Sequence, residues 1–165
     1  MKVSTMLPIL AITALLSLTS CSTESIPDNN ADALNLQQAP PAKIIEIEIL
    51  ERINEHRISI GLNALQNHDV IKSVAFTHTD YMIEADNVSH DNFFQRKSSL
   101  EAHANATKVS ENVAYAFSSA ESVVNAWINS DGHRANIEGD YTDFDISAEK
   151  DEEGDWYFTN IFIKR

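Results

Sequence analysis

Cysteine, basic residues and long apolar runs are all scarce in this chain of 165 residues. A single cysteine excludes an intrachain disulfide framework and any multi-cysteine metal site. Only 12 lysines and arginines stand against 25 aspartates and glutamates, and the net charge of −13 argues against nucleic acid as a partner. The chain also lacks a His-Glu-x-x-His zinc signature and the Gly-x-Ser-x-Gly turn of a serine hydrolase. A hydrophobic fraction of 43% with 22% charged residues is nevertheless typical of one globular domain.

Residues 1–20 have the pattern of a secretory signal peptide. Their apolar run, Met6 to Leu18, is shorter than the roughly 20 residues that a membrane-spanning helix needs. It leads into Leu18-Thr19-Ser20-Cys21, which resembles the lipobox of bacterial lipoproteins. We expect Cys21 to be lipidated, with acyl chains such as palmitate anchoring the protein in a membrane of the bacterial cell envelope. The residue after Cys21 is Ser22 rather than an aspartate, which by resemblance to lipoproteins of diderm bacteria favours the outer membrane. The alternative is an ordinary cleaved signal peptide with an incidental cysteine.

Residues 21–42 are predicted to be a flexible tether between the lipid and the folded domain. They hold three of the four prolines together with many small polar residues. Such a segment has too few large apolar side chains to bury a core of its own. The folded domain is therefore predicted to cover residues 43–165.

The domain is predicted to consist of helices followed by terminal strands. Apolar residues at helical spacing indicate three helices, at 44–60, 69–85 and 119–129. Residues 86–110 show little regular pattern, and we expect a loop there. Residues 144–148 and 156–163 predict a β-hairpin around the acidic turn 151–155. This order indicates an α+β domain with helices packed on an antiparallel sheet.

Six short motifs follow one another through this domain. They are INEHR at 53–57 with GLNAL at 61–65, AFTHTDYM at 75–82, VSHD at 88–91, SENVA at 110–114, WINSDGHRANI at 127–137 and an aromatic strand at 156–162. Their order resembles the CAP superfamily: cysteine-rich secretory proteins, antigen 5 and plant pathogenesis-related proteins, with their bacterial SCP-domain relatives. The resemblance implies a three-layer α-β-α sandwich with a central, mainly antiparallel sheet. The lack of disulfides matches the bacterial branch.

The resemblance also implies a cleft that holds two histidines and acidic residues. The matching positions are His90, Glu111 and His133. The family's second acid falls on Ser130, and Asp131 stands one position later. Two neutral imidazoles and a carboxylate suit a divalent metal such as zinc, so His90, His133 and Glu111 are candidate ligands. The alternatives are a general base at a histidine and a buried hydrogen-bonded cluster without chemistry.

Other residues are weaker candidates for chemistry. Ser89 and Ser110 neighbour His90 and Glu111 in sequence, which suggests a Ser-His-Glu protease. Adjacent residues of a strand point to opposite faces, which argues against that assignment. His78 lies on an apolar helix stripe and is expected to be a hydrogen-bonded core histidine. Trp127 and Trp156 are expected to be core anchors.

Two classes of function fit these residues. The first is a non-enzymatic binding module, facing the surface or the periplasm, whose cleft receives a lipid, glycan or protein ligand. The second is a metal-assisted hydrolase of the cell envelope. The absence of a clear second acid and of an activated nucleophile favours the binding module.

Overall fold

A computed structural model describes residues 36–165 of the chain. The signal peptide, Cys21 and the tether as far as residue 35 lie outside the described residues. The described residues form five helices: α1 (Ile44–Ser59), α2 (Asp69–Glu84), α3 (Phe93–Ala104), α4 (Ala120–Asn129) and α5 (Asp131–Ile137). The strands are β1 (Gln66–Asn67), β2 (Lys108–Tyr115), β3 (Asp143–Lys150) and β4 (Trp156–Lys164). Within residues 36–165, no helix combines the length and apolarity needed to cross a bilayer.

The four strands form one sheet in the order β1-β3-β4-β2. Strand β4 pairs antiparallel with β3 on one side and with β2 on the other. Strand β1 pairs parallel with β3 over only two residues, Gln66 and Asn67. The sheet is therefore mainly antiparallel, and the predicted terminal hairpin is confirmed as β3 and β4.

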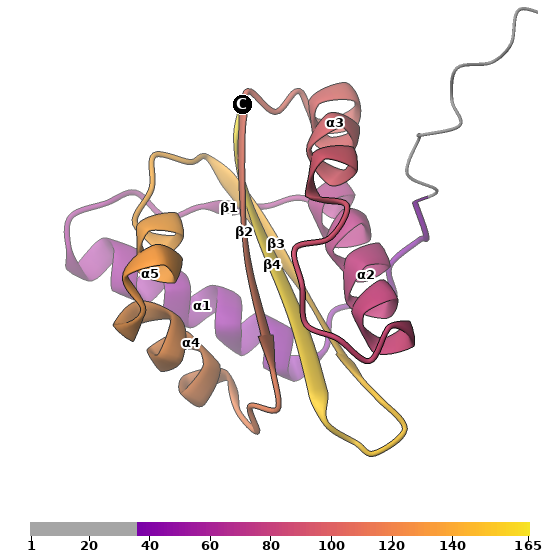
Figure 1. Ribbon diagram of the computed structural model, residues 1–165. Coiled ribbons are helices and arrows are strands. Elements are labelled where there is room, and N and C mark those ends of the chain that lie inside the picture. The colour runs from indigo at the N-terminus through magenta and orange to yellow at the C-terminus, as the bar shows by residue number, and fades with distance from the viewer. Residues whose placement is uncertain (1–35) are drawn as a thin grey trace, which may run out of the picture. The chain divides into compact units, whose positions relative to one another are not determined.

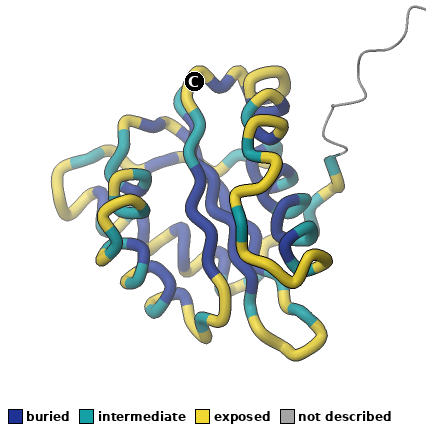
Figure 2. The backbone as a smooth tube through the Cα atoms, viewed as in Figure 1, coloured by how far each residue is buried: buried dark blue, intermediate teal, exposed yellow. Residues whose placement is uncertain are grey.

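Helices cover both faces of the sheet, which confirms the three-layer α-β-α sandwich (Figure 1). Helices α1, α4 and α5 pack on one face and share a core with Phe158 and Phe162 of β4. Helices α2 and α3 cover the other face over Ile161 and Ile163. Because side chains alternate along a strand, β4 supplies apolar residues to both layers. Its burial runs unbroken through the middle of the molecule in Figure 2.

Local signals explain where α1 begins and ends and where α4 begins. At the start of α1, the backbone N–H of Lys43 donates to the carboxylate of Glu46 at 2.7 Å, which satisfies one free donor of the helix N-terminus. Gly61 follows α1 with φ +85°, a conformation that favours glycine. Ser119 accepts a hydrogen bond from the backbone N–H of Ser122 and caps α4, as its position in the sequence predicts.

The prediction of a loop at residues 86–110 is wrong, because this segment contains α3 and the start of β2. Helix α3 lies between Asn92 and Asn105, which both adopt positive φ. Its buried positions include Arg96 and Ser99 alongside Leu100, so the helix lacks a clear apolar stripe. A search for apolar periodicity therefore overlooks it.

The two tryptophans differ in depth. Trp127 is buried, and its indole N–H donates to the carbonyl oxygen of Val113 at 3.2 Å. Trp156 is only partly buried at the end of the hairpin, with the Lys150 ammonium 4.9 Å from its ring centroid. Trp127 is therefore confirmed as a core anchor, whereas Trp156 is partly buried and packs against the edge of the same core.

Candidate functional site

Glu111 lies at the centre of the candidate site, in the middle of β2. Its side chain faces the layer of α2 and α3, and it is buried. The next residue, Asn112, faces the opposite layer, because neighbouring side chains of a strand alternate. The SENVA motif thus sends a carboxylate to one face of the edge strand and an amide to the other.

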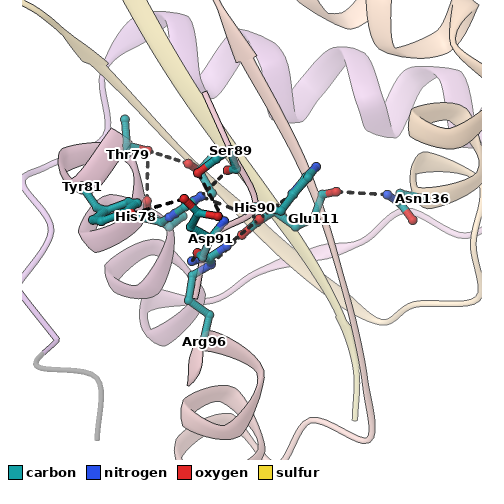
Figure 3. A network of polar contacts seen from close by, with 11 residues as sticks. His78, Thr79, Tyr81, Ser89, His90, Asp91, Arg96, Glu111 and Asn136 are labelled. Carbon is teal, nitrogen blue, oxygen red and sulfur yellow. Dashed lines mark hydrogen bonds and ion pairs between the residues drawn. The ribbon is translucent and has the colours of Figure 1, made fainter. Parts of the chain in front are cut away.

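Arg96 and His90 hold the Glu111 carboxylate (Figure 3). Arg96, buried on α3, donates from Nε to Oε2 and from Nη2 to Oε1, both at 2.7 Å. His90 Nδ1 donates to Oε1 at 2.8 Å. The bidentate arginine contact is the strong planar form of such a pair. Both carboxylate oxygens are therefore occupied by charged or polar partners.

The same cluster ties the loop before α3 to the rest of the domain. Arg96 also donates to the carbonyl oxygen of Asp91 at 2.6 Å. His78 of α2, which is buried, donates to the carbonyl oxygen of Ser89 at 2.9 Å. The expectation that His78 is a satisfied core histidine is confirmed. The polar contacts thus hold the loop that carries His90 against both α2 and β2.

The electrostatics of the site follow from this pairing. Burial alone raises the pKa of Glu111, but hydrogen bonds from His90 and Arg96 outweigh it and leave that pKa below its ordinary value. Burial lowers the pKa of His78, against the opposing charge of Glu111. Glu111 is therefore an ionised partner of Arg96 at neutral pH.

His133 joins this region from α5, on the far side of β2. Its backbone carbonyl oxygen accepts from Asn112 at 3.1 Å, and its Nδ1 lies 2.8 Å from Ser130 Oγ. Asn136 donates to the backbone carbonyl oxygen of Glu111 at 3.1 Å. Burial lowers the pKa of His133, and the nearby charge of His90 lowers it further. His133 is thus coupled to the cluster without touching the Glu111 carboxylate.

Asp131 does not belong to the cluster. Its side chain is 93% exposed and pairs with Arg134 of its own helix at 2.6 Å. The structure thus places neither Ser130 nor Asp131 as a second acid beside Glu111. A local i,i+3 pair at the start of α5 accounts for the position of Asp131.

The side chains present do not fit a divalent metal. Within residues 36–165, no group of three or more histidine, cysteine, aspartate or glutamate side chains is arranged to hold one. The carboxylate proposed as a ligand is engaged by Arg96, whose cation repels a metal at the same position. His90 and His133 each use Nδ1 on a protein partner, so only Nε2 of each ring is left for a metal, and no third side chain of the described residues accompanies them. Zinc binding by His90, Glu111 and His133 stays a prediction that this geometry does not support.

Sequence reasoning missed Arg96, the strongest partner of Glu111. The residue lies inside a segment without apolar periodicity, and a buried arginine resembles an exposed one in sequence. Its one local signal is Phe93, whose ring centroid lies 6.0 Å from the guanidinium carbon. That signal is too general to identify a buried ion pair.

The comparisons with known proteins identify the family. Residues 50–162 match the CAP profile, described as the cysteine-rich secretory protein family. This match covers more than half of the chain, which therefore belongs to the cysteine-rich secretory protein family. It includes strand β2 and all the helices that carry the candidate site.

Among curated proteins, the chain is similar to the "Uncharacterized membrane protein YlbC" of Bacillus subtilis. The two are 33% identical over 124 residues. The alignment covers 73% of this chain but only 34% of the relative, so the chain spans about a third of that protein's length.

Three solved structures share the fold. An outer surface protein of Borrelia burgdorferi superposes with a TM-score of 0.64 at 24% identity, over 71% of this chain and 90% of that one. An extracellular SCP-domain protein of Bacillus anthracis has a TM-score of 0.64 at 22% identity, over 73% and 40%. A cysteine-rich secretory protein of Staphylococcus aureus has a TM-score of 0.62 at 22% identity, over 72% and 38%. The relatives are thus described as outer-surface, extracellular, secretory or membrane proteins.

Proposed function

We propose that this chain is a lipid-anchored, non-enzymatic binding domain of a bacterial cell envelope. The observation that carries the proposal is the saturation of Glu111 by Arg96 and His90. A carboxylate that acts as a general base must reach its substrate and have a pKa near the working pH. Glu111 is buried, its pKa is lowered, and both of its oxygens are engaged. The cluster is better suited to holding a surface in place than to transferring protons.

The surface that the cluster holds is the turn from Val88 to Phe94. His90 has 53% of its side chain exposed although its Nδ1 is fixed on Glu111. Phe94, in the first turn of α3, is 79% exposed. An aromatic ring and an imidazole on a rigid turn lose little conformational entropy on binding, which favours recognition. We assign this turn to the capture of a lipid, glycan or protein ligand.

The anchor rests on the sequence of the lipobox. Lipid attachment at Cys21 would hold the binding turn within the length of the tether from the membrane. The descriptions of the relatives as outer-surface, extracellular or membrane proteins support a position outside the cytoplasm. Ser22, which follows the cysteine, supports delivery to the outer membrane.

A paired-variant binding assay tests the recognition turn. Purified wild-type protein and the His90→Ala/Phe94→Ala variant are titrated with peptidoglycan fragments, lipid vesicles and peptides from the envelope. We expect the double variant to lose about tenfold or more in affinity for the ligand that binds the wild type. A matched control, His103→Ala/Ile58→Ala, removes an exposed histidine and an exposed apolar residue elsewhere and should bind like the wild type.

The same preparations test the hydrolase alternative. Turnover of an envelope substrate that disappears with a chelator and returns with zinc would overturn the non-enzymatic assignment. Equal binding by the double variant and the wild type would place the ligand outside the turn.

Membrane fractionation tests the anchor separately. Cys21→Ala should move the protein from the membrane fraction to the soluble fraction, because the acyl chains supply the membrane affinity. Ser22→Ala, which leaves the cysteine in place, is the control and should stay with the membrane. Membrane association that survives Cys21→Ala contradicts the lipoprotein assignment.

A further inference from the structure

A second set of buried charges lies at the open edge of β3, away from the turn that carries His90. Strand β1 covers β3 only at Asp143 and Phe144, so the following residues of β3 lack a strand partner on that side. Lys72 of α2 donates to the carbonyl oxygen of Ile146 at 2.7 Å. Glu46 of α1 accepts from the backbone N–H of Ala148 at 2.8 Å. The two side chains, 2.6 Å apart, thus take the place of a neighbouring strand.

A cavity of about 470 Å³ opens beside this pair. We call residues 36–42 the strap. Near its own beginning this segment contacts α2, and it then leads directly into the start of α1. The backbone N–H of Gln37 donates to Thr77 Oγ1 at 3.2 Å, and its side-chain amide donates to Asp80 at 3.1 Å. The cavity is lined by Gln38, Ala39, Pro40, Pro41, Ala42, Asn67, Asp69, Lys72, Ser73 and Asp145. Its size falls in the range of small-molecule sites.

Asp145 is the buried carboxylate in the wall of this cavity. It is buried to more than nine-tenths, and its oxygens accept only backbone N–H groups, from Ile146 at 2.9 Å and His68 at 3.2 Å. Among the ion pairs within residues 36–165, none includes Asp145. Burial raises its pKa to about 6. A buried carboxylate without a cation is costly, and a cationic ligand in the cavity would supply the missing partner.

The charges around the cavity favour a cation over an anion. Asp69 and Asp145 line the cavity with two carboxylates. Lys72 lines it with one ammonium, and the buried Glu46 carboxylate already pairs that charge. A metal ion is a poor fit, because no group of three or more suitable side chains within the described part of the chain is arranged to hold one. An organic cation needs only one carboxylate when its body rests on apolar walls. The strap supplies such walls through Pro40 and its neighbours.

We propose that the cavity between the strap, α2 and β3 is a binding site for an organic ammonium or guanidinium group, with Asp145 as its counter-ion. The site is distinct from the surface around His90. Asp145 and Glu111 both align with Ile161, on opposite sides of β4, so the backbones of the two residues lie about 10 Å apart, two strand spacings. The proposal goes beyond the proposed function and does not depend on it.

Matched probes with one body and different head groups test the site. The full chain in detergent is titrated with butylammonium, butylguanidinium, butanol and butanoate, and binding is followed by calorimetry or ligand-observed NMR. We expect the two cations to bind and the neutral and anionic probes to bind at least about tenfold more weakly, because only cations pair with Asp145. Equal binding of all four probes would overturn the assignment to a cation.

Two variants locate the binding. Asp145→Asn keeps the shape of the side chain and should weaken cation binding about tenfold or more. Ser73→Trp fills the cavity from α2 without changing any charge, so it should block binding even if Asp145→Asn perturbs the fold. Glu121→Gln removes a carboxylate from the exposed first turn of α4 and should leave binding unchanged. Cation binding that survives both cavity variants would overturn the site.

The pH dependence of binding provides a further check. The charged or titratable groups around Asp145 are Glu46 of α1, Lys72 and Asp69 of α2, and His68 before α2. The part of β4 opposite Asp145, residues 159–163, and the cavity-lining part of the strap contribute none. Cation affinity should fall as pH drops through about 6, where Asp145 takes up a proton. A fall of the same size in Asp145→Asn would assign the titration to another group and contradict the role of Asp145.

Discussion

Two buried carboxylates of the sheet, Glu111 and Asp145, occupy equivalent positions with opposite surroundings. Both are cross-strand neighbours of Ile161 in β4, Glu111 from β2 and Asp145 from β3. Both face the layer of α2 and α3. Glu111 has Arg96 on both oxygens, and its pKa is lowered. Asp145 has only backbone N–H partners, and its pKa is raised to about 6. The helix layer above each strand, rather than the sheet itself, decides whether a carboxylate is neutralised or left to accept a ligand.

This difference separates two roles for a buried charge. A carboxylate with a bidentate arginine is a structural connection, and removing either partner leaves a charge that water cannot reach. A carboxylate without a cation lowers stability in the free protein, and the domain retains it at that cost. The contrast supports a positioning role for Glu111 and a ligand-facing role for Asp145.

The largest effect should come from Arg96→Ala. The substitution leaves Glu111 buried without its cation and also removes the contact to Asp91. We expect a loss of about 3–5 kcal/mol in the free energy of unfolding, measured by urea denaturation of the purified protein.

A double variant provides the control for this experiment. Arg96→Met combined with Glu111→Leu removes both charges and should recover most of the lost stability, because a buried pair is often replaceable by apolar residues. A loss below about 1 kcal/mol in Arg96→Ala would mean that Glu111 is well solvated without arginine and does not depend on it for neutralisation.

In contrast to Arg96→Ala, the Asp145→Asn substitution should increase the free energy of unfolding at neutral pH. In the wild type the folded chain holds the Asp145 proton more tightly than the unfolded chain, because its pKa rises from 3.8 to about 6. Stability should therefore decrease as pH increases from about 4 to about 6, and the loss should persist above pH 6. The asparagine variant lacks this loss and should be more stable than the wild type at pH 7 by about 1–2 kcal/mol, after allowance for one weakened backbone hydrogen bond.

Thermal unfolding of both proteins between pH 4 and pH 8 measures this effect. The two stability profiles should converge near pH 4 and separate as the pH rises. Profiles that stay parallel over the whole range would show that the pKa of Asp145 is the same in the folded and unfolded chains, contrary to the effect of its burial.

The smallest effect should come from His90→Ala. His90 donates one hydrogen bond to Glu111, but its side chain is about half exposed, so water can replace it. We expect a cost below about 1 kcal/mol by urea denaturation, against the much larger cost of Arg96→Ala. Equal costs for the two variants would assign the neutralisation of Glu111 to the histidine.

The fold was predictable wherever local patterns are strong. Helices α1, α2 and α4 and the β3–β4 hairpin follow apolar periodicity and capping residues, and all four are confirmed. Helix α3 was not predictable in this way, because it buries Arg96 and leaves Phe94 exposed. Apolar periodicity assumes that the inward face is apolar, and α3 breaks that assumption to place a cation over β2.

The site was only partly predictable. Motif resemblance pointed to His90 and Glu111, which the structure brings into contact, and to His133, which it places on α5 beside β2. It did not reveal Arg96, which becomes visible only when α3 is packed over the sheet. Asp131 was a candidate from its position in the sequence alone, and its exposed side chain pairs within α5.

The sequence by itself determined the class of fold, the family and the positions of most helices and strands, because these depend on local spacing and on short motifs. Tertiary structure decided the roles of the charged residues. Glu111 and Asp145 are chemically similar in sequence, yet one is paired and the other is not. The physical reason is that the energy of a buried charge depends on its partners within a few ångströms, and those partners come from segments that only folding brings together.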